Sequence, residues 1–149
     1  MNTTDIRIRS LNEDDAARMC ELNRQLGYEA GVPEMKQRME QLGKTGGHWL
    51  QGAQIADRLA GFIHFYLRPS IETGAGLVVQ SLVVDEAIRG RGLGRILLGE
   101  AEAMARELSL ASVGLASRVE REDAHAFYIR QGYTVSATSR YFRKAIEQP

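Results

Sequence analysis

The sequence predicts an α/β fold of the α+β kind, in which a mixed, mostly antiparallel central sheet is flanked by about four helices. Short apolar runs of strand length alternate with longer segments of helical period. Two of these runs are separated by a two-residue turn, which is typical of antiparallel neighbours, and a later run leads through glycines into an amphipathic helix. With 149 residues, 44% of them hydrophobic, the chain is expected to form a single domain over residues 1–149.

A strand and a helix are expected first. Residues 6–9 alternate between isoleucine and arginine, as in a half-buried strand. Ser10 and Glu13 have the spacing of a capping box, which predicts a helix that extends to about Leu26. Gly27 is expected to end this helix, because glycine readily adopts the left-handed conformation found at helix C-termini.

A second helix is expected to begin near Pro33. Proline suits the first turn of a helix, where its missing N–H removes no hydrogen bond. The glycine-rich residues 43–47 are expected to end the helix. Between these limits, one helical face carries the apolar side chains Met35, Met39 and Leu42.

Three strands are predicted next. Trp49–Ala56 and Ala60–Leu67 are rich in apolar residues and turn at Asp57-Arg58, so they are expected to pair antiparallel. A polar loop that contains Glu72 then leads to a third strand, Leu77–Val84. All three would belong to the central sheet.

Helices and strands alternate in the remainder of the chain. Residues 93–108 keep apolar side chains at helical spacing, and residues 111–116 have the composition of a short strand. Residues 122–131 predict another helix, which Gly132 ends. Two further strands would complete the sheet, Tyr133–Val135 and Tyr141–Ala145.

The charge and cysteine content narrow the class of protein. Lys plus Arg and Asp plus Glu both number 19, so the net charge gives no reason to expect a nucleic acid or a membrane as partner. Cys20 is the single cysteine and cannot form an intrachain disulfide, and neither a signal peptide nor a long apolar run is visible. We therefore expect a cytoplasmic protein. The three histidines lie far apart in the sequence, so no metal site is expected.

The segment Arg89–Gly94 carries the strongest chemical signal, because it places glycines between an expected strand and an expected helix. Glycines allow the backbone to approach a ligand closely, and the free N–H groups of the first helical turn favour an anion. Two familiar phosphate loops are excluded. A dinucleotide fingerprint would need glycine in place of Arg95, and the Gly-Lys-Ser/Thr ending of a P-loop is missing.

Two motifs together resemble the GCN5-related N-acetyltransferases. The pattern Arg-x-x-Gly-x-Gly is met by Arg89, Gly92 and Gly94. Residues 123–133 are similar to the C-terminal signature of that family, Ala-x-x-Phe-Tyr-x-x-x-Gly-aromatic, at the expected distance downstream. The resemblance spans the chain from Ile6 to about Ile146.

The resemblance implies acetyl-CoA as co-substrate and a splay between the strand before the glycine loop and the next strand. The pantetheine arm of the co-substrate would then pair with the open strand edge like an additional strand. The residues implied to contact the arm are Leu82, Val83 and Val84. Those implied to bind the pyrophosphate are Arg89, Arg91, Gly92, Gly94 and Arg95.

The catalytic roles implied by the resemblance are unequally supported. Tyr128 occupies the position of a tyrosine that protonates the departing thiolate, so it is the expected general acid. The backbone N–H of Val84 would stabilise the oxyanion. The glutamate that some members carry on the strand before the loop is absent here, which leaves the base for the amine open. The candidates are His64, Glu72, or a water held by Ser81 or Gln80.

A further departure from the family pattern lies before the second motif. Many members have an asparagine three residues ahead of the alanine, whereas this chain has Arg121. The contact with the co-substrate that is ascribed to that asparagine is therefore in doubt. Ser117, at the end of the preceding strand, could replace it.

Two loops are expected to shape the acceptor site, residues 26–32 and residues 68–74. Tyr28, Glu29 and Glu72 could hold a cationic amine, and Arg68 could hold a carboxylate or phosphonate. The second half of the chain looks most like small bacterial members that acetylate small-molecule amines, aminoalkylphosphonate acetyltransferases among them.

These features predict an N-acetyltransferase that moves an acetyl group from acetyl-CoA to a primary amine of a small molecule by direct attack in a ternary complex. One alternative is acetylation of a protein lysine or N-terminus. An alternative of another class is a non-catalytic module that binds or senses acyl-CoA. A homodimer is compatible with the sequence but is not required by it.

Overall fold

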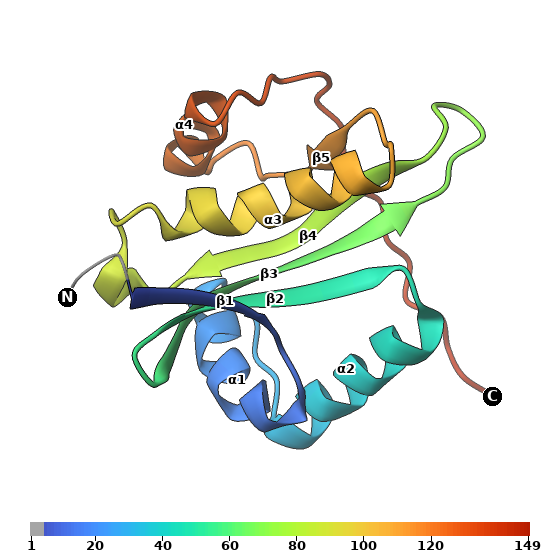
Figure 1. Cartoon of the computed structure of the whole chain (residues 1–149). Coiled ribbons are helices and arrows are strands. Elements are labelled where there is room, and N and C mark those ends of the chain that lie inside the picture. The colour runs from blue at the N-terminus through green and yellow to red at the C-terminus, as the bar shows by residue number, and fades with distance from the viewer. Residues whose placement is uncertain (1–4) are drawn as a thin grey trace. The chain divides into compact units, whose positions relative to one another are not determined.

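The computed structural model describes residues 5–149, and their contacts divide them into two compact units (Figure 1). The N-terminal unit extends to Ala116, and the C-terminal unit comprises Ser117–Pro149. Each unit is described by itself below. Within residues 5–149, no helix is long and apolar enough to span a bilayer.

The N-terminal unit is built on a five-stranded sheet in the order β1-β2-β3-β4-β5. The first four strands are antiparallel neighbours, and β5 runs parallel to β4. This mixed, mostly antiparallel sheet confirms the fold class predicted from the sequence. The strands are β1 (Ile6–Ser10), β2 (His48–Ile55), β3 (Arg58–Arg68), β4 (Gly76–Val84) and β5 (Val113–Leu115).

Helices cover both faces of this sheet, with α1 (Ala16–Gln25) and α2 (Val32–Thr45) on one face and α3 (Leu93–Glu107) on the other (Figure 1). One face of α3 is buried at Leu93, Leu97, Leu98, Ala101 and Ala105, as its helical periodicity predicts. The core on the face of α1 and α2 combines helix and strand residues: Ala16, Met19, Cys20, Leu22, Met35, Leu59, Phe62 and Val83.

The cap of the first helical segment differs from the prediction. The capping box is formed by Asn12 and Asp15, and it begins a short 3-10 turn, η2 (Glu13–Asp15), that leads into α1. The Asn12 side chain accepts a hydrogen bond from the backbone N–H of Asp14 at 2.9 Å, and the Asn12 N–H donates to the Asp15 carboxylate at 2.9 Å. Ser10 is unsuited to the role because it still belongs to β1.

The second helix is longer than predicted, because Gly43 lies inside it. A glycine in a helix interior costs about 1 kcal/mol relative to alanine, which tertiary packing readily offsets. The helix ends at Thr45, where Gly46 and Gly47 take φ values of 75° and 71°. The change to positive φ, rather than glycine content, therefore sets the end of α2.

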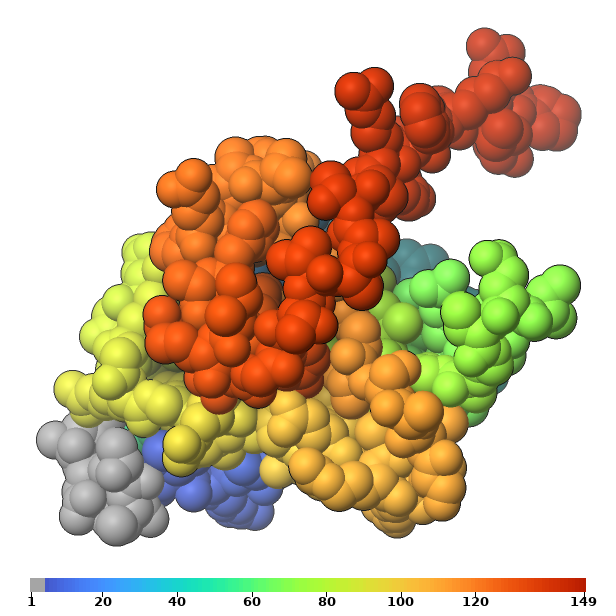
Figure 2. All heavy atoms as spheres, turned by 90° about the horizontal axis from the view of Figure 1, so that it is seen from above, coloured from blue at the N-terminus to red at the C-terminus, as the bar shows by residue number. Residues whose placement is uncertain are grey.

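The C-terminal unit contains α4 (Glu122–Arg130), which ends as predicted at Gly132 with φ 91°. The predicted strands 133–135 and 141–145 were wrong, since residues 133–149, all of them described, form no strand. The backbone N–H of Tyr133 instead donates to the Tyr128 carbonyl and closes the helix. In Figure 2 the chain after α4 is extended, with the apolar side chains of Val135, Tyr141, Phe142 and Ile146 exposed. A strand needs a partner edge, which composition alone does not supply.

Candidate active site

The site is centred on the edge of β4 that β5 leaves open. The two strands pair only at Leu77–Val79, opposite Val113–Leu115. Within the described residues, the remainder of β4, residues 80–84, has no strand partner on that side. Backbone N–H and C=O groups on an open edge are available to a ligand. The predicted splay between these two strands is therefore present.

A β-bulge in β4 accompanies this opening. His64 of β3 pairs with Ser81, but the next residue, Phe65, pairs with Val79, so Gln80 is an extra residue without a partner on β3. Such a bulge bends its strand and increases the local twist. It lies just where pairing with β5 ends. The bulge thus gives a physical reason for the divergence of the two strands.

The direction of the β4 backbone can be read from one hydrogen bond. The N–H of Asp85 donates to the Ala60 carbonyl of β3 at 2.8 Å. Because successive N–H groups of a strand point to opposite sides, those of Leu82 and Val84 point toward the open edge, whereas that of Val83 points toward β3. Two backbone donors therefore face the gap.

The N-terminus of α3 continues from this edge through the glycine loop. Gly90 and Gly92 have φ values of 87° and 78°, and Gly92 is the N-cap residue of α3. The N–H groups of the first helical turn have no intrahelical acceptor, and no side chain caps the helix in their place. A Cβ added to either glycine would meet nothing within 4 Å, so the surface above the loop is open. This geometry suits an anion.

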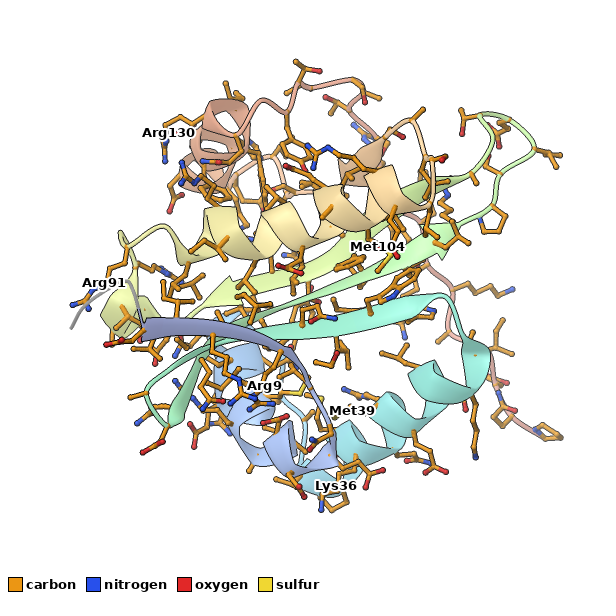
Figure 3. All side chains as sticks on the ribbon, viewed as in Figure 1. Arg9, Lys36, Met39, Arg91, Met104 and Arg130 are labelled. Atoms are coloured by element: carbon orange, nitrogen blue, oxygen red, sulfur yellow. The ribbon has the colours of Figure 1, made fainter. Side chains whose placement is uncertain are left out.

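Three arginines surround the helix N-terminus. Arg89, Arg91 and Arg95 are exposed, and no hydrogen bond or ion pair within residues 5–149 engages their side chains. Figure 3 shows Arg91 projecting from the loop that precedes α3. Guanidinium groups bind phosphate through bidentate, charge-assisted hydrogen bonds. The residues predicted to bind a pyrophosphate thus lie together around one helix end.

The loop is anchored to α1 through the buried carboxylate of Asp85. That carboxylate accepts hydrogen bonds from Arg18 Nη2 at 2.6 Å, from the Ala87 N–H at 3.1 Å and from Gln25 Nε2 at 3.3 Å. Gln25 also accepts a bond from the Glu86 N–H at 2.9 Å. The hydrogen bond from Arg18 is the main cause that holds the pKa of Asp85 below its usual range. We call these contacts of Asp85 and Glu86 with Arg18 and Gln25 the clamp. It could not be predicted from the sequence, because no local pattern links Arg18 and Asp85, which are 67 positions apart.

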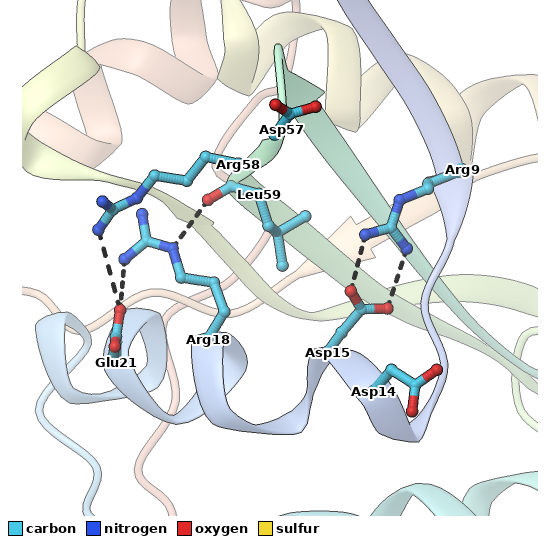
Figure 4. Close-up of a pocket in the computed structure, with 8 residues that line it drawn as sticks. All are labelled: Arg9, Asp14, Asp15, Arg18, Glu21, Asp57, Arg58 and Leu59. Atoms are coloured by element: carbon cyan, nitrogen blue, oxygen red, sulfur yellow. Dashed lines mark hydrogen bonds and ion pairs between the residues drawn. The ribbon is translucent and has the colours of Figure 1, made fainter.

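A charged pocket of about 340 Å³ lies beside the clamp (Figure 4). Arg9 donates two hydrogen bonds to Asp15 at 2.7 and 2.9 Å, and Arg18 donates to the Leu59 carbonyl at 2.9 Å. Glu21 accepts from Arg18 at 2.8 Å. These charged groups are paired with one another. Their hydrogen bonds hold α1 and the turn before it against the sheet, so the arginines concerned are not free to bind a ligand. None of the predicted site residues lines it.

A pair of histidines lies on the sheet face that α1 and α2 cover. His48 of β2 and His64 of β3 form a hydrogen bond of 2.9 Å between Nδ1 of the former and Nε2 of the latter. His64 stands opposite Ser81 in the register. Burial, with a smaller contribution from His48, lowers the pKa of His64 to about 4. His64 is therefore neutral at pH 7, as a base must be.

The residues predicted to bind the acceptor do not form one site. Tyr28 and Glu29 lie in the loop between α1 and α2, whereas Glu72 lies in the loop between β3 and β4, and Figure 1 shows these loops well separated. All three side chains are exposed. Glu29 forms an ion pair with Arg24 at 3.3 Å. The geometry offers no common pocket for this set.

Tyr128 lies on α4 and is half-buried. Its ring makes edge contacts with Phe127 and Tyr133, at centroid distances of 5.3 and 6.3 Å. Burial raises its pKa above the ordinary value, and the charge of Arg121 opposes that shift only in part. The phenol therefore remains protonated at physiological pH. In the same unit, the Ser117 hydroxyl is buried and has no hydrogen-bond partner within the described residues.

An open strand edge that leads into an uncapped, arginine-flanked helix N-terminus is an arrangement that suits an extended ligand with a phosphorylated end. The family model for the Acetyltransferase (GNAT) family matches residues 16–133. The chain belongs to this family, and the match extends across the boundary between the two units.

Curated relatives agree with this assignment. Over 80 residues, 53% of this chain and 55% of the relative, the chain is 39% identical to the uncharacterized N-acetyltransferase YhdJ of Bacillus subtilis. Over 87 residues, 58% of this chain and 54% of the relative, it is 32% identical to an aminoalkylphosphonate N-acetyltransferase of Salmonella typhimurium. The chain thus matches about half the length of each relative.

Solved structures share the fold. An aminoglycoside antibiotic 6′-N-acetyltransferase of Acinetobacter haemolyticus, AAC(6′)-Ig, superposes with a TM-score of 0.82 over 95% of this chain and 99% of that one. The sequences are 20% identical, so the similarity concerns the fold.

Proposed function

We propose that this protein is an N-acetyltransferase that moves the acetyl group of acetyl-CoA to a primary amine of a small molecule, by direct attack in a ternary complex. The observation that carries the proposal is the continuity between the open edge of β4 and the uncapped N-terminus of α3. A single ligand could occupy both places if it has a peptide-like arm that pairs with the edge of β4 and a pyrophosphate that binds at the N-terminus of α3.

Acetyl-CoA fits the groups that are available. Its pantetheine arm contains amides, which can pair with the N–H groups of Leu82 and Val84 like an added strand. Val83 lies between them and packs its side chain into the core. The pyrophosphate would bind to the helix N-terminus and the guanidinium groups, through Arg89, Arg91, Gly92, Gly94 and Arg95.

The thioester supplies an activated acyl group, and the protein contributes polar groups at fixed positions. The Val84 N–H is proposed to donate to the oxygen that becomes negatively charged as the amine attacks. Leu82 presents a second N–H on the same edge, one pleat closer to the bulge. Donors on a paired strand need little reorganisation during the reaction, which is the source of their catalytic effect.

Tyr128 is proposed to protonate the departing thiolate. A phenol of pKa near 10 or above transfers its proton to a thiolate, whose conjugate acid has a pKa near 8.5, at a cost of about 2 kcal/mol or more. The benefit therefore arises from a hydrogen bond that strengthens as charge develops on sulfur. Ser117, with its buried unpartnered hydroxyl, is proposed to donate to the co-substrate in place of the family's asparagine.

The acceptor must lose a proton before it attacks. At pH 7 about one in a thousand alkylammonium groups of pKa near 10 is neutral, a handicap of about 4 kcal/mol. Of the predicted bases, His64 is opposite Ser81 on β4 and neutral at pH 7, whereas Glu72 is exposed in a loop. We therefore favour His64, directly or through a water that Ser81 holds.

A small-molecule acceptor is supported by the relatives' names, which specify an aminoalkylphosphonate and an aminoglycoside. Arg68 at the end of β3 is a candidate to bind a phosphonate or carboxylate. A protein acceptor and a non-catalytic sensing role are the outcomes that would replace this proposal.

The test is the consumption of acetyl-CoA with a pooled panel of small amines, with products resolved by mass for a single acetyl increment. Tyr128→Phe is expected to retain affinity for acetyl-CoA and to lose about 10²- to 10⁴-fold in turnover. Binding of acetyl-CoA without transfer to any small amine, while peptides are modified, would favour a protein acceptor. Binding without transfer to either would favour a sensing module.

A further inference from the structure

The two histidines on the sheet face opposite α3 form a connected pair that no sequence motif indicates. A distance of 2.9 Å between His48 Nδ1 and His64 Nε2 requires that one of these nitrogens carry a proton and the other accept it. Both rings are half-buried, and the His48 ring stacks on Tyr66 at a centroid distance of 5.3 Å. The stacking and the hydrogen bond hold the His48 ring in one orientation.

The pair lies on two neighbouring strands, β2 and β3, and His64 adjoins a third, β4. His64 lies opposite Ser81 on β4, whereas His48 lies on β2 and lines a second pocket, of about 360 Å³, beside α2. The apolar residues that line this pocket include Leu11, Met39 and Leu50. One end of the histidine pair therefore faces the strand of the proposed acyl site, and the other faces an open pocket.

Carboxylates accompany His48 at this pocket. Glu13 at the start of η2 and Glu40 of α2 are among its lining residues, and Glu40 also forms an ion pair with Lys44 at 3.0 Å. Besides His64, Tyr66 is a titratable group of β3 that contacts His48. Burial disfavours a protonated His64 in the sheet, whereas the pocket that His48 lines is open.

We propose that His48 and His64 form a proton relay that carries the proton of the acceptor ammonium from β4 to the pocket beside α2. In this relay His64 Nδ1 accepts a proton from the ammonium, directly or through one water, while the His64 Nε2 proton passes to His48 Nδ1. His48 then releases its Nε2 proton to water in the pocket. One proton enters and one leaves, and the amine is left neutral for attack.

Two histidines can keep the proton away from the amine, whereas His64 alone could not. Burial makes the His64 ring about 300-fold weaker as a base than an exposed histidine, because its pKa is about 4 rather than 6.5. A proton that stayed on His64 would return to the amine. Transfer to His48 moves the charge from the His64 ring, where burial disfavours it, to the ring that lines the open pocket, which is the physical reason for a relay rather than a single base.

The inference rests on the proposed function, and the experiment separates the two. The rate of acetyl transfer is measured from about pH 6 to about pH 10 for the parent, His48→Gln, His64→Gln and the double variant, with an alkylamine of pKa near 10 and an alkoxyamine of pKa near 5. His125, the third histidine, lies on α4 and hydrogen-bonds to the Arg118 carbonyl, so His125→Gln is the matched control.

Each single variant is expected to lose about 10²-fold in kcat/KM with the alkylamine at pH 7, the size of a general-base contribution. The loss should shrink toward pH 10, where the alkylamine is already neutral, and should be less than about threefold with the alkoxyamine. The double variant should be no worse than either single variant, because the two rings act as a unit. Affinity for acetyl-CoA should be unchanged.

A relay is overturned if His48→Gln transfers acetyl groups at the parental rate and with the parental pH profile. It is also overturned if the losses are equal for both amines, since packing damage does not depend on the pKa of the amine. Failure of the parent with every amine would instead reject the proposed function. Nitrogen-15 spectra of the histidines check the pair without turnover, since His64 should stay neutral down to about pH 4.

Discussion

Replacing Asp85 with asparagine tests whether the clamp between α1 and the glycine loop holds the co-substrate site in place. The substitution preserves the size of the side chain and one oxygen that can accept from the Ala87 N–H. It removes the negative charge that Arg18 contacts at 2.6 Å. We expect a less stable protein and weaker binding of acetyl-CoA.

The magnitude follows from what each group loses. A hydrogen bond between charged groups contributes about 1.5–3 kcal/mol, and breaking a fully buried pair costs about 3–5 kcal/mol because one charge is left without a partner. Arg18 keeps Glu21 and the Leu59 carbonyl, so it is not left unpaired. We therefore expect a loss of about 2 kcal/mol in the free energy of unfolding, or about 4–8 °C in Tm for a chain of this size.

The assay is urea unfolding between about pH 3 and pH 7, combined with acetyl-CoA titration. The folded-state pKa of Asp85 is depressed, so its contribution is present above the unfolded pKa near 3.9 and is lost as the pH falls through the folded value. The difference between parent and variant should therefore narrow in acid. Asp57→Asn, at an exposed turn residue of the charged pocket, is the control. A change below about 0.5 kcal/mol for Asp85→Asn, with unchanged affinity, would refute the reasoning.

Three further outcomes are expected. Gly92→Ala should destabilise the fold by about 1–2 kcal/mol and weaken acetyl-CoA binding, because the φ of Gly92 is 78°. Gly99→Ala, inside α3, should instead stabilise the fold by up to about 1 kcal/mol. Equal effects of the two substitutions in urea unfolding would contradict this expectation. Arg91→Ala should weaken acetyl-CoA binding and reduce its dependence on salt, as measured by calorimetry at two ionic strengths; an unaltered salt dependence would argue against a phosphate contact. The depressed pKa of His64 means that stability should fall as the pH decreases from about 6.5 to about 4, by about 2 kcal/mol after allowance for partial exposure, and His64→Gln should remove this dependence in acid unfolding.

Much of the fold could be predicted because its signals are local. The alternation in residues 6–9 became β1, and the apolar spacing from Leu93 became the buried face of α3. Gly27 and Gly132 ended helices with positive φ, as their identity indicates. Where the local signal was ambiguous, prediction was wrong: Gly43 is inside α2, and Asn12 rather than Ser10 caps η2.

The candidate site was predicted unevenly for the same reason. The glycine loop and its arginines form one continuous segment, so their grouping follows directly from the chain. The acceptor residues Tyr28, Glu29 and Glu72 were chosen from two loops that are distant in the sequence, and the fold does not bring those loops together. Tyr128 keeps its role as a prediction, as do the single domain and the cytoplasmic location.

The sequence by itself determined the order of helices and strands up to α4, the glycine loop at the start of α3 and the family. These depend on spacing along the chain, which backbone geometry converts directly into local structure. Only the tertiary structure decided the bulge at Gln80, the bond from Arg18 to Asp85 and the pairing of His48 with His64. Each depends on strand register or on helix packing across many residues, and a shift of one residue in register would turn the paired side chains to opposite faces.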